Sequence, residues 1–196
     1  MVSPATLDRR QAVAALMAER GDLLVVAGLG SPAYDLHAAG DHDANFYLWG
    51  AMGGAALTGL GLAQAQPGRP VLVLTGDGEA LMGLGGLATI AVAAPKNLTI
   101  AVLDNGHFGE TGMQKSHTGH GLDLAAVAAA CGLAETGTIR DMAGIETLRA
   151  SLHQPAAGPR LFVVKVEARN LPRSLPARDA VYLKNRFRGH LGLGVN

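Results

Sequence analysis

Two short polar motifs each follow an apolar run, and their residue types suit the binding of a phosphorylated ligand. Gly76-Asp77-Gly78 follows VLVLT, and Asp104-Asn105-Gly106 follows LTIAVL. Short apolar runs of this kind are typical of strands buried on both faces of a parallel sheet. Ligands bind beyond the carboxyl ends of such strands, where free backbone amides face anions. We therefore expect the two motifs to share one site.

A cation is needed in such a site, because Asp77 alone would repel a phosphate. Mg²⁺ takes near-octahedral oxygen ligands and shares them between one or two protein groups and the phosphates of a ligand. Asp77 can supply one oxygen, Asn105 a second and a backbone carbonyl just beyond Asn105 a third. Gly76 permits a tight turn, and Gly78 lets backbone amides approach a phosphate. Each motif alone could be a simple turn, but together they predict a magnesium diphosphate site.

Two further acidic residues in these motifs do not need to be metal ligands. Glu79 can serve a helix N-terminus, where negative charge is favourable, and Asp104 can cap or orient its loop.

The elements that must position these motifs alternate along the chain. Strands are predicted at residues 22–28, 45–49, 71–76, 98–105, 135–139 and 160–168, and helices at 6–20, 31–39, 53–65, 80–94, 122–132 and 141–154. Strands separated by helices predict an α/β fold, with a doubly wound parallel sheet and helices on both faces. We expect one domain over residues 1–196, with an irregular or helical tail from about residue 170 that is either solvated or in contact with a partner chain.

Composition excludes several classes of protein. The 196 residues carry 16 basic and 16 acidic side chains, so no net charge would attract nucleic acid or an anionic membrane surface. A single cysteine, Cys131, excludes an intramolecular disulfide and fits a reducing compartment. The longest uncharged stretch, residues 46–66, is interrupted by glycines, and the first 20 residues lack a long apolar core. We expect a cytoplasmic protein without a membrane span.

The order Gly76-Asp77-Gly78, 26 residues and then Asn105 resembles a known signature. It is similar to the thiamine-diphosphate motif in the diphosphate-binding (PP) domain of thiamine-diphosphate-dependent 2-oxo acid decarboxylases. The resemblance implies thiamine diphosphate and Mg²⁺ as cofactors. It also implies that Asp77, Asn105 and the carbonyl of His107 bind the metal.

The resemblance extends upstream to Trp49-Gly50-Ala51-Met52-Gly53. In the family, the carbonyl at the position of Gly50 accepts the 4'-amino group of the cofactor. The bulky residue at the position of Met52 supports the thiazolium ring, so that the cofactor bends into a V that brings the 4'-imino nitrogen beside C2. These two residues are therefore the expected catalytic positions. The resemblance further places the following residues at the cofactor: Gly30, Ser31, Gly76, Gly78, Glu79, Ala80, Asn105, Phe108 and Gly109.

The resemblance also implies a second chain. Full-length relatives carry a pyrimidine-binding (PYR) domain whose Glu polarises the aminopyrimidine ring, and 196 residues leave no room for it. NFYLWGAMGGAALTGLGLA and GDGEALMGLGGLATIA resemble the beta subunit of sulfopyruvate decarboxylase and the matching half of phosphonopyruvate decarboxylase. We therefore expect decarboxylation of a small anionic 2-oxo acid by a hetero-oligomer, a dimer or larger, in which a PYR-domain chain supplies the Glu.

One departure leaves the substrate open. Those decarboxylases tend to have Thr-Gly-Gly-Gln after the metal loop, whereas this chain has Thr111-Gly112-Met113-Gln114. Lys115, His117 and His120 follow, and they either meet an anionic head group or belong to a polar surface loop.

Three alternatives remain at this point. Gly28-Leu29-Gly30-Ser31-Pro32-Ala33 matches a dinucleotide fingerprint, although a ribose-binding acid is not found at the end of the next strand. The chain could be an inactive or regulatory module that keeps the cofactor site. It could also be a subunit of a 2-oxoacid:ferredoxin oxidoreductase, although one cysteine argues against that class.

Overall fold

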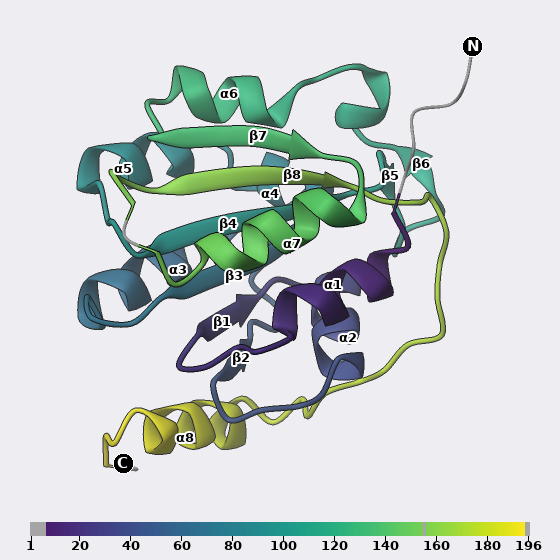
Figure 1. Ribbon diagram of the computed structural model, residues 1–196. Helices are drawn as coiled ribbons and strands as arrows, with labels where there is room; N and C mark the ends of the chain where they lie inside the picture. The colour runs from purple at the N-terminus through teal and green to yellow at the C-terminus, as the bar shows by residue number, and fades with distance from the viewer. Residues whose placement is uncertain (1–6, 155, 195–196) are drawn as a thin grey trace.

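Six parallel strands form the centre of the protein (Figure 1). The computed structural model describes residues 7–154 and 156–194. The strand order is β2-β1-β3-β4-β8-β7, and each neighbouring pair is parallel. The strands are β1 (Leu24–Ala27), β2 (Asn45–Tyr47), β3 (Val71–Gly76), β4 (Leu98–Asp104), β7 (Glu135–Ile139) and β8 (Arg160–Lys165). The predicted α/β fold with a parallel sheet is confirmed.

Helices cover both faces of this sheet (Figure 1). One face carries α1 (Arg9–Met17), α2 (Ser31–Ala38) and α7 (Met142–Ser151). The other carries α3 (Ala55–Ala65), α4 (Asp77–Met82), α5 (Gly86–Ala93) and α6 (Leu124–Ala130). A last helix, α8 (Ala180–His190), packs against the edge strand β2 through Phe46 and Phe187, whose ring centroids are 5.5 Å apart.

The apolar core is divided into two layers by the sheet. Successive side chains of a strand point to opposite faces, so Val25 and Ala27 of β1 join one cluster while Leu24 and Val26 join the other. Because both faces are buried, the central strands β1, β3 and β4 are largely apolar rather than alternating. This is why their positions could be predicted from short apolar runs.

The chain reverses its direction of winding between β1 and β3. From β1 it passes through α2 to the edge strand β2, and then crosses by α3 on the other face to β3, on the other side of β1. Ligands of open α/β sheets bind at such a switch point, beyond the carboxyl ends of the strands. Gly28 and Gly76, which follow or end these two strands, lie at this point.

The helix predicted at residues 80–94 is wrong in its boundaries. It is two helices, α4 and α5, which are separated at Gly83–Gly85, and α4 begins at Asp77. A Cβ on Gly83 would overlap the carbonyl oxygen of Gly53, so the start of α3 passes too close for a side chain there. This close crossing interrupts the helix.

A small substructure after β4 was not predicted. It consists of the hairpin β5 (His107–Phe108) and β6 (Gln114–Lys115), followed by the 3-10 helix η1 (Thr118–His120). Where the tail was predicted, residues 170–179 are irregular and α8 follows.

Some expectations concern residues that the structure does not fully describe. Residues 1–6 lie outside the described ranges. They include part of the N-terminus that was expected to lack a leader and the first residue of the helix predicted at 6–20. Within the described residues this helix, α1, begins at Arg9. In the described part of the chain, no helix is both long enough and apolar enough to cross a membrane. The cytoplasmic location stays a prediction.

Two glycines of α3 allow a test of its packing on the sheet. A Cβ on Gly59 would overlap Cγ2 of the buried Val73, whereas a Cβ on the exposed Gly61 meets nothing within 4 Å. Gly59→Ala should lower the free energy of unfolding by about 1–3 kcal/mol through overpacking. Gly61→Ala should raise it by about 0.5–1 kcal/mol through helix propensity. Urea unfolding measures both, and equal effects of the two substitutions would contradict this packing.

Candidate functional site

A cavity of about 220 Å³ lies at the carboxyl ends of β1, β3 and β4. Ten of the predicted site residues line it: Ser31, Met52, Gly76, Asp77, Gly78, Glu79, Asn105, His107, Phe108 and Gly109. The cavity is also lined by residues that were not predicted, namely Arg9, Leu29, Pro32, Leu103, Glu110 and Thr111. The fold therefore brings the two sequence motifs to one place.

Three predicted residues do not line this cavity. Gly30 lies beside it, where it caps the N-terminus of α2 with φ 80°. Gly50 is exposed in the turn between β2 and α3, with φ 71°. Ala80 faces a separate small cavity of about 10 Å³ between α3, α4 and the sheet. The place of Ala80 at the cofactor stays a prediction.

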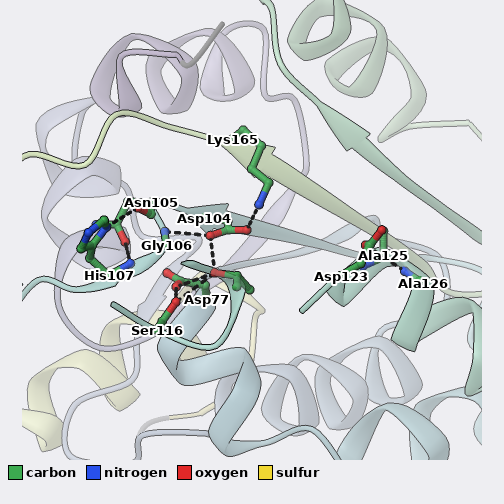
Figure 2. Close-up of polar contacts among 11 residues, drawn as sticks. Asp77, Asp104, Asn105, Gly106, His107, Ser116, Asp123, Ala125, Ala126 and Lys165 are labelled. Carbon is green, nitrogen blue, oxygen red and sulfur yellow. Dashed lines mark hydrogen bonds and ion pairs between the residues drawn. The ribbon is translucent and has the colours of Figure 1, made fainter. Parts of the chain in front are cut away.

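The carboxylate of Asp77 is buried in a cluster of polar side chains (Figure 2). Ser116 donates a hydrogen bond to Oδ2 of Asp77, and the hydroxyl of Thr118 lies 3.1 Å from the same oxygen. Thr118 also lies 2.7 Å from Oδ1 of Asp104. Since a hydroxyl has one proton, Thr118 can donate to only one of the two carboxylates at a time.

Negative charge is therefore incompletely neutralised at this point. Burial raises the pKa of Asp77, and the neighbouring Asp104 raises it further, while the hydroxyls of Ser116 and Thr118 oppose the shift. The one cationic side chain recorded in the cluster is Lys165, which pairs with the other carboxylate, Asp104. A divalent cation at Asp77 would offset the remaining charge.

Asp104 orients its loop, as predicted. Its Oδ1 accepts a hydrogen bond from the backbone amide of Gly106 at 2.9 Å, and its Oδ2 pairs with Lys165 of β8 (Figure 2). The turn that carries Asn105 is thereby fixed to the end of the neighbouring strand.

Asn105 and His107 form a compact turn beside this cluster. The side-chain oxygen of Asn105 accepts the amide of His107 at 2.9 Å, and Nδ1 of His107 lies 2.8 Å from the carbonyl oxygen of Asn105. A carbonyl oxygen has two lone pairs, so the Asn105 amide oxygen can still bind a metal.

These residues fit the predicted magnesium site. Ser116 and Thr118 both bind Oδ2 of Asp77, which leaves Oδ1 available, and Asn105 adds a neutral oxygen. Within the described residues no three His, Cys, Asp or Glu side chains gather as a metal site. A metal here would therefore rely on amide, carbonyl and phosphate oxygens, which is the donor set that Mg²⁺ prefers.

Glu79 serves a helix N-terminus, but that of α3 rather than its own. Its Oε1 accepts the amide of Ala55, the first residue of α3, at 3.3 Å, and its Oε2 accepts the hydroxyl of Thr75 at 2.7 Å. Burial raises the pKa of Glu79, and these hydrogen bonds oppose the shift. A Cβ on Gly28 would overlap the Glu79 carboxylate, so this glycine makes room for it.

Gly78 keeps open the space between two large side chains. A Cβ at this position would lie 2.9 Å from the ring of Phe108 and 3.8 Å from the terminal methyl group of Met52. Phe108 in turn packs edge-on against His117. The absence of a side chain at Gly78 therefore lets the Phe108 ring pack against the start of α4, with the end of Met52 close by.

The irregular tail holds the loop at the cavity rim. Asn170 donates to the carbonyl oxygen of Gly109 at 3.2 Å, and Arg173 pairs with Glu110 at 2.7 Å. Further along, Trp49 donates to the carbonyl oxygen of Ala177 at 2.9 Å. We call residues 170–177 the strap. No sequence pattern indicated these contacts, because they join segments that lie far apart in the chain.

Lys115, His117 and His120 lie outside the cavity. All three are exposed, Lys115 on β6, His117 just before η1 and His120 at the end of η1, and none of them lines the cavity. The structure therefore favours the surface-loop interpretation of these residues.

Comparison with known proteins assigns this site to a family. Residues 33–166, more than half of the chain, match the family described as "Thiamine pyrophosphate enzyme, C-terminal TPP binding domain". The chain belongs to this family. The predicted cofactor, thiamine diphosphate, is the one that names the domain, and the family match gives no support to the dinucleotide interpretation of Gly28-Leu29-Gly30.

Relatives of this thiamine pyrophosphate domain include named decarboxylases. The phosphonopyruvate decarboxylase of Streptomyces hygroscopicus is 51% identical over 108 residues, which are 55% of this chain and 26% of that protein. The sulfopyruvate decarboxylase subunit beta of Methanococcus maripaludis is 32% identical over 183 residues, which are 92% of this chain and 96% of that subunit. The chain thus spans about a quarter of one relative and nearly all of the other.

A solved structure supports the fold of the thiamine pyrophosphate domain. The structure of benzoylformate decarboxylase from Polynucleobacter necessarius superposes with a TM-score of 0.68 at 19% sequence identity. The match covers 87% of this chain and 36% of the benzoylformate decarboxylase chain. At this identity the likeness concerns the fold.

Lys165 should be essential to the stability of the acidic cluster. Its removal leaves the Asp104 carboxylate, 1% exposed, without its cation, and uncompensated charges in such settings cost about 3–5 kcal/mol. We expect Lys165→Met to reduce the free energy of unfolding by about 3 kcal/mol, the lower end of that range, because the lysine is partly solvated. Urea unfolding should show most of the loss recovered in Lys165→Met/Asp104→Asn. No recovery would contradict the electrostatic explanation.

Proposed function

We propose that the chain is the diphosphate- and Mg²⁺-binding subunit of a thiamine-diphosphate-dependent 2-oxo acid decarboxylase. The observation that carries this proposal is the cavity at the ends of β3 and β4. There the buried Asp77 and the neutral oxygen of Asn105 face a site with excess negative charge. The names of the relatives support decarboxylation as the reaction.

Different residues of the chain would bind different parts of the cofactor. Asp77, Asn105 and the carbonyl of His107 would hold Mg²⁺, which in turn would bind the diphosphate. Met52, which lines the cavity, would support the thiazolium ring, and the carbonyl of Gly50 would accept the 4'-amino group. When bound, thiamine diphosphate supplies an electron sink for the carbon that loses carbon dioxide.

The substrate would be a small 2-oxo acid with an anionic head group. Sulfopyruvate and phosphonopyruvate, which the names of the relatives contain, are both of this class. Lys115, His117 and His120 lie outside the cavity, so they would meet the head group only if the substrate extends beyond the rim.

A second chain with a pyrimidine-binding domain would complete the active site and supply the activating Glu. The relative from Methanococcus maripaludis, which matches nearly the whole chain, is named as a subunit. Exposed apolar side chains on this chain mark a surface for such a partner: Met52 is 44% exposed, Leu57 43% and Met82 68%. They lie together, because Gly53 approaches Met82 and Gly86 approaches Leu57.

The metal site can be tested by removing its carboxylate. Asp77→Ala should abolish Mg²⁺-dependent binding of thiamine diphosphate, with a loss of at least about 100-fold in affinity. The other two carboxylates in the cavity lining, Glu79 and Glu110, are held by Thr75 and Arg173 and are not placed to replace that ligand. Isothermal titration calorimetry of the wild-type chain and the variant, with and without Mg²⁺, measures the effect.

A matched control separates metal binding from folding. Asp123→Ala removes a carboxylate that caps α6, away from the cavity, and should leave cofactor affinity unchanged. If wild-type binding does not depend on Mg²⁺, or if Asp77→Ala binds normally, the proposed metal site is wrong.

The apolar rim can be tested on its own. Met82→Glu should weaken assembly with the PYR-domain chain at least about tenfold, because a charge would be buried in an apolar contact. Val92→Glu is the control, since Val92 is 89% exposed near the end of α5, which leads to the start of β4 and so away from the carboxyl ends of the strands. Analytical ultracentrifugation of each variant, mixed with a candidate PYR-domain chain encoded by a neighbouring gene, measures assembly in both cases. Unchanged assembly in Met82→Glu would exclude this surface.

Turnover distinguishes the proposed enzyme from an inactive module. If the chain is an enzyme subunit, the complex of both chains should release carbon dioxide from a 2-oxo acid. If the chain is an inactive module, the same complex would bind thiamine diphosphate but release no carbon dioxide.

A further inference from the structure

Arg9, the first residue of α1, presents a buried cation to the cavity. Its side chain is 5% exposed, yet it lines the cavity together with Ser31, Pro32 and Gly76. Burial of an arginine is costly unless its charge is compensated, so its position requires an explanation.

Asp35 of α2 compensates only part of the Arg9 guanidinium. Nε of Arg9 donates to Oδ2 of Asp35, which is fully buried, and Nε of Arg10 lies 3.3 Å from the other oxygen. Within the described residues no hydrogen bond from the two Nη atoms of Arg9 is recorded. The ion pair therefore fixes the orientation of the guanidinium and leaves its terminal nitrogens for a ligand.

The charges around the cavity indicate the sign of that ligand. Arg9 is the one Arg or Lys among the described residues that line it, whereas Asp77, Glu79 and Glu110 line it as well. Glu79 is occupied by Thr75 and the amide of Ala55, and Glu110 by Arg173. The anion for Arg9 must therefore come from outside the chain, and the planar guanidinium is suited to two oxygens of a phosphoryl group.

We propose that Arg9 binds the terminal phosphate of the cofactor diphosphate and so determines that the diphosphate, rather than the monophosphate, is bound. The inference rests on the proposed function, since it requires the diphosphate to occupy this cavity. Asp77 and Asn105 lie at the ends of β3 and β4, whereas Arg9 reaches the cavity from α1, beside the start of α2. A diphosphate held by the metal at one end would thus contact Arg9 at the other.

The test compares two variants that differ only at Arg9. Asp35→Asn removes the buried charge but keeps an amide oxygen that can accept the Nε–H of Arg9 and so orient the guanidinium. Arg9→Met/Asp35→Asn then removes the cation without leaving a buried carboxylate unpaired. Calorimetry with Mg²⁺ should show thiamine diphosphate and inorganic pyrophosphate binding about 10- to 100-fold more weakly to the double variant than to Asp35→Asn. Thiamine monophosphate should bind equally to both variants.

Each other outcome contradicts the inference in a distinct way. Equal affinity of the two variants for thiamine diphosphate would overturn the role of Arg9 and leave the proposed function intact. Weaker binding of a 2-oxo acid alone, with unchanged pyrophosphate affinity, would assign Arg9 to the substrate instead. Failure of the wild-type chain to bind thiamine diphosphate and pyrophosphate, both alone and in complex with the PYR-domain chain, would overturn the proposed function, and the inference with it. Thermal unfolding of both variants verifies that they fold equally.

Discussion

The site depends on two carboxylates that the sheet brings together. Asp77 and Asp104 end neighbouring parallel strands, so they cannot move apart without breaking the pairing of β3 and β4. Burial and like charge both raise the pKa of Asp77. The surrounding residues compensate for this: Lys165 pairs with Asp104, and the turn beyond β6 brings the hydroxyls of Ser116 and Thr118 between the two acids.

On the face of the sheet covered by α3 and α4, the backbone segments around the site pack unusually close together, and glycines make this possible. The start of α3 crosses the α4–α5 junction so tightly that Gly83 cannot carry a side chain. Glu79 reaches from α4 to the first amide of α3 past Gly28, and it thereby ties three elements together beneath the cavity. The abundance of glycine in this sequence therefore has a structural cause at these positions.

The sequence was most informative where local pattern determines structure. The apolar run VLVLTG located β3 to the residue, because both faces of the sheet are buried there. The short run ETGTI, which is rich in β-branched residues, located β7 equally well. The metal motif was also visible, since it follows directly from two strand ends. Sequence could not reveal Arg9 or Thr118 as site residues, because each reaches the site through tertiary packing. The break of the predicted helix between α4 and α5 likewise depends on Gly53, some thirty positions earlier.

The strap has a consequence for how the protein is made. Every strand of the six-stranded sheet lies before residue 166, whereas the groups that hold the cavity loop, Asn170 and Arg173, come after it. During synthesis the sheet can thus form before its ligand loop is fixed. A chain that ends after β8 would contain every strand of this sheet, but its loop at Gly109 and Glu110 would lack these anchors and its core would lack Leu183 and Phe187 of α8. Maturation of the site is therefore a later event than folding of the sheet.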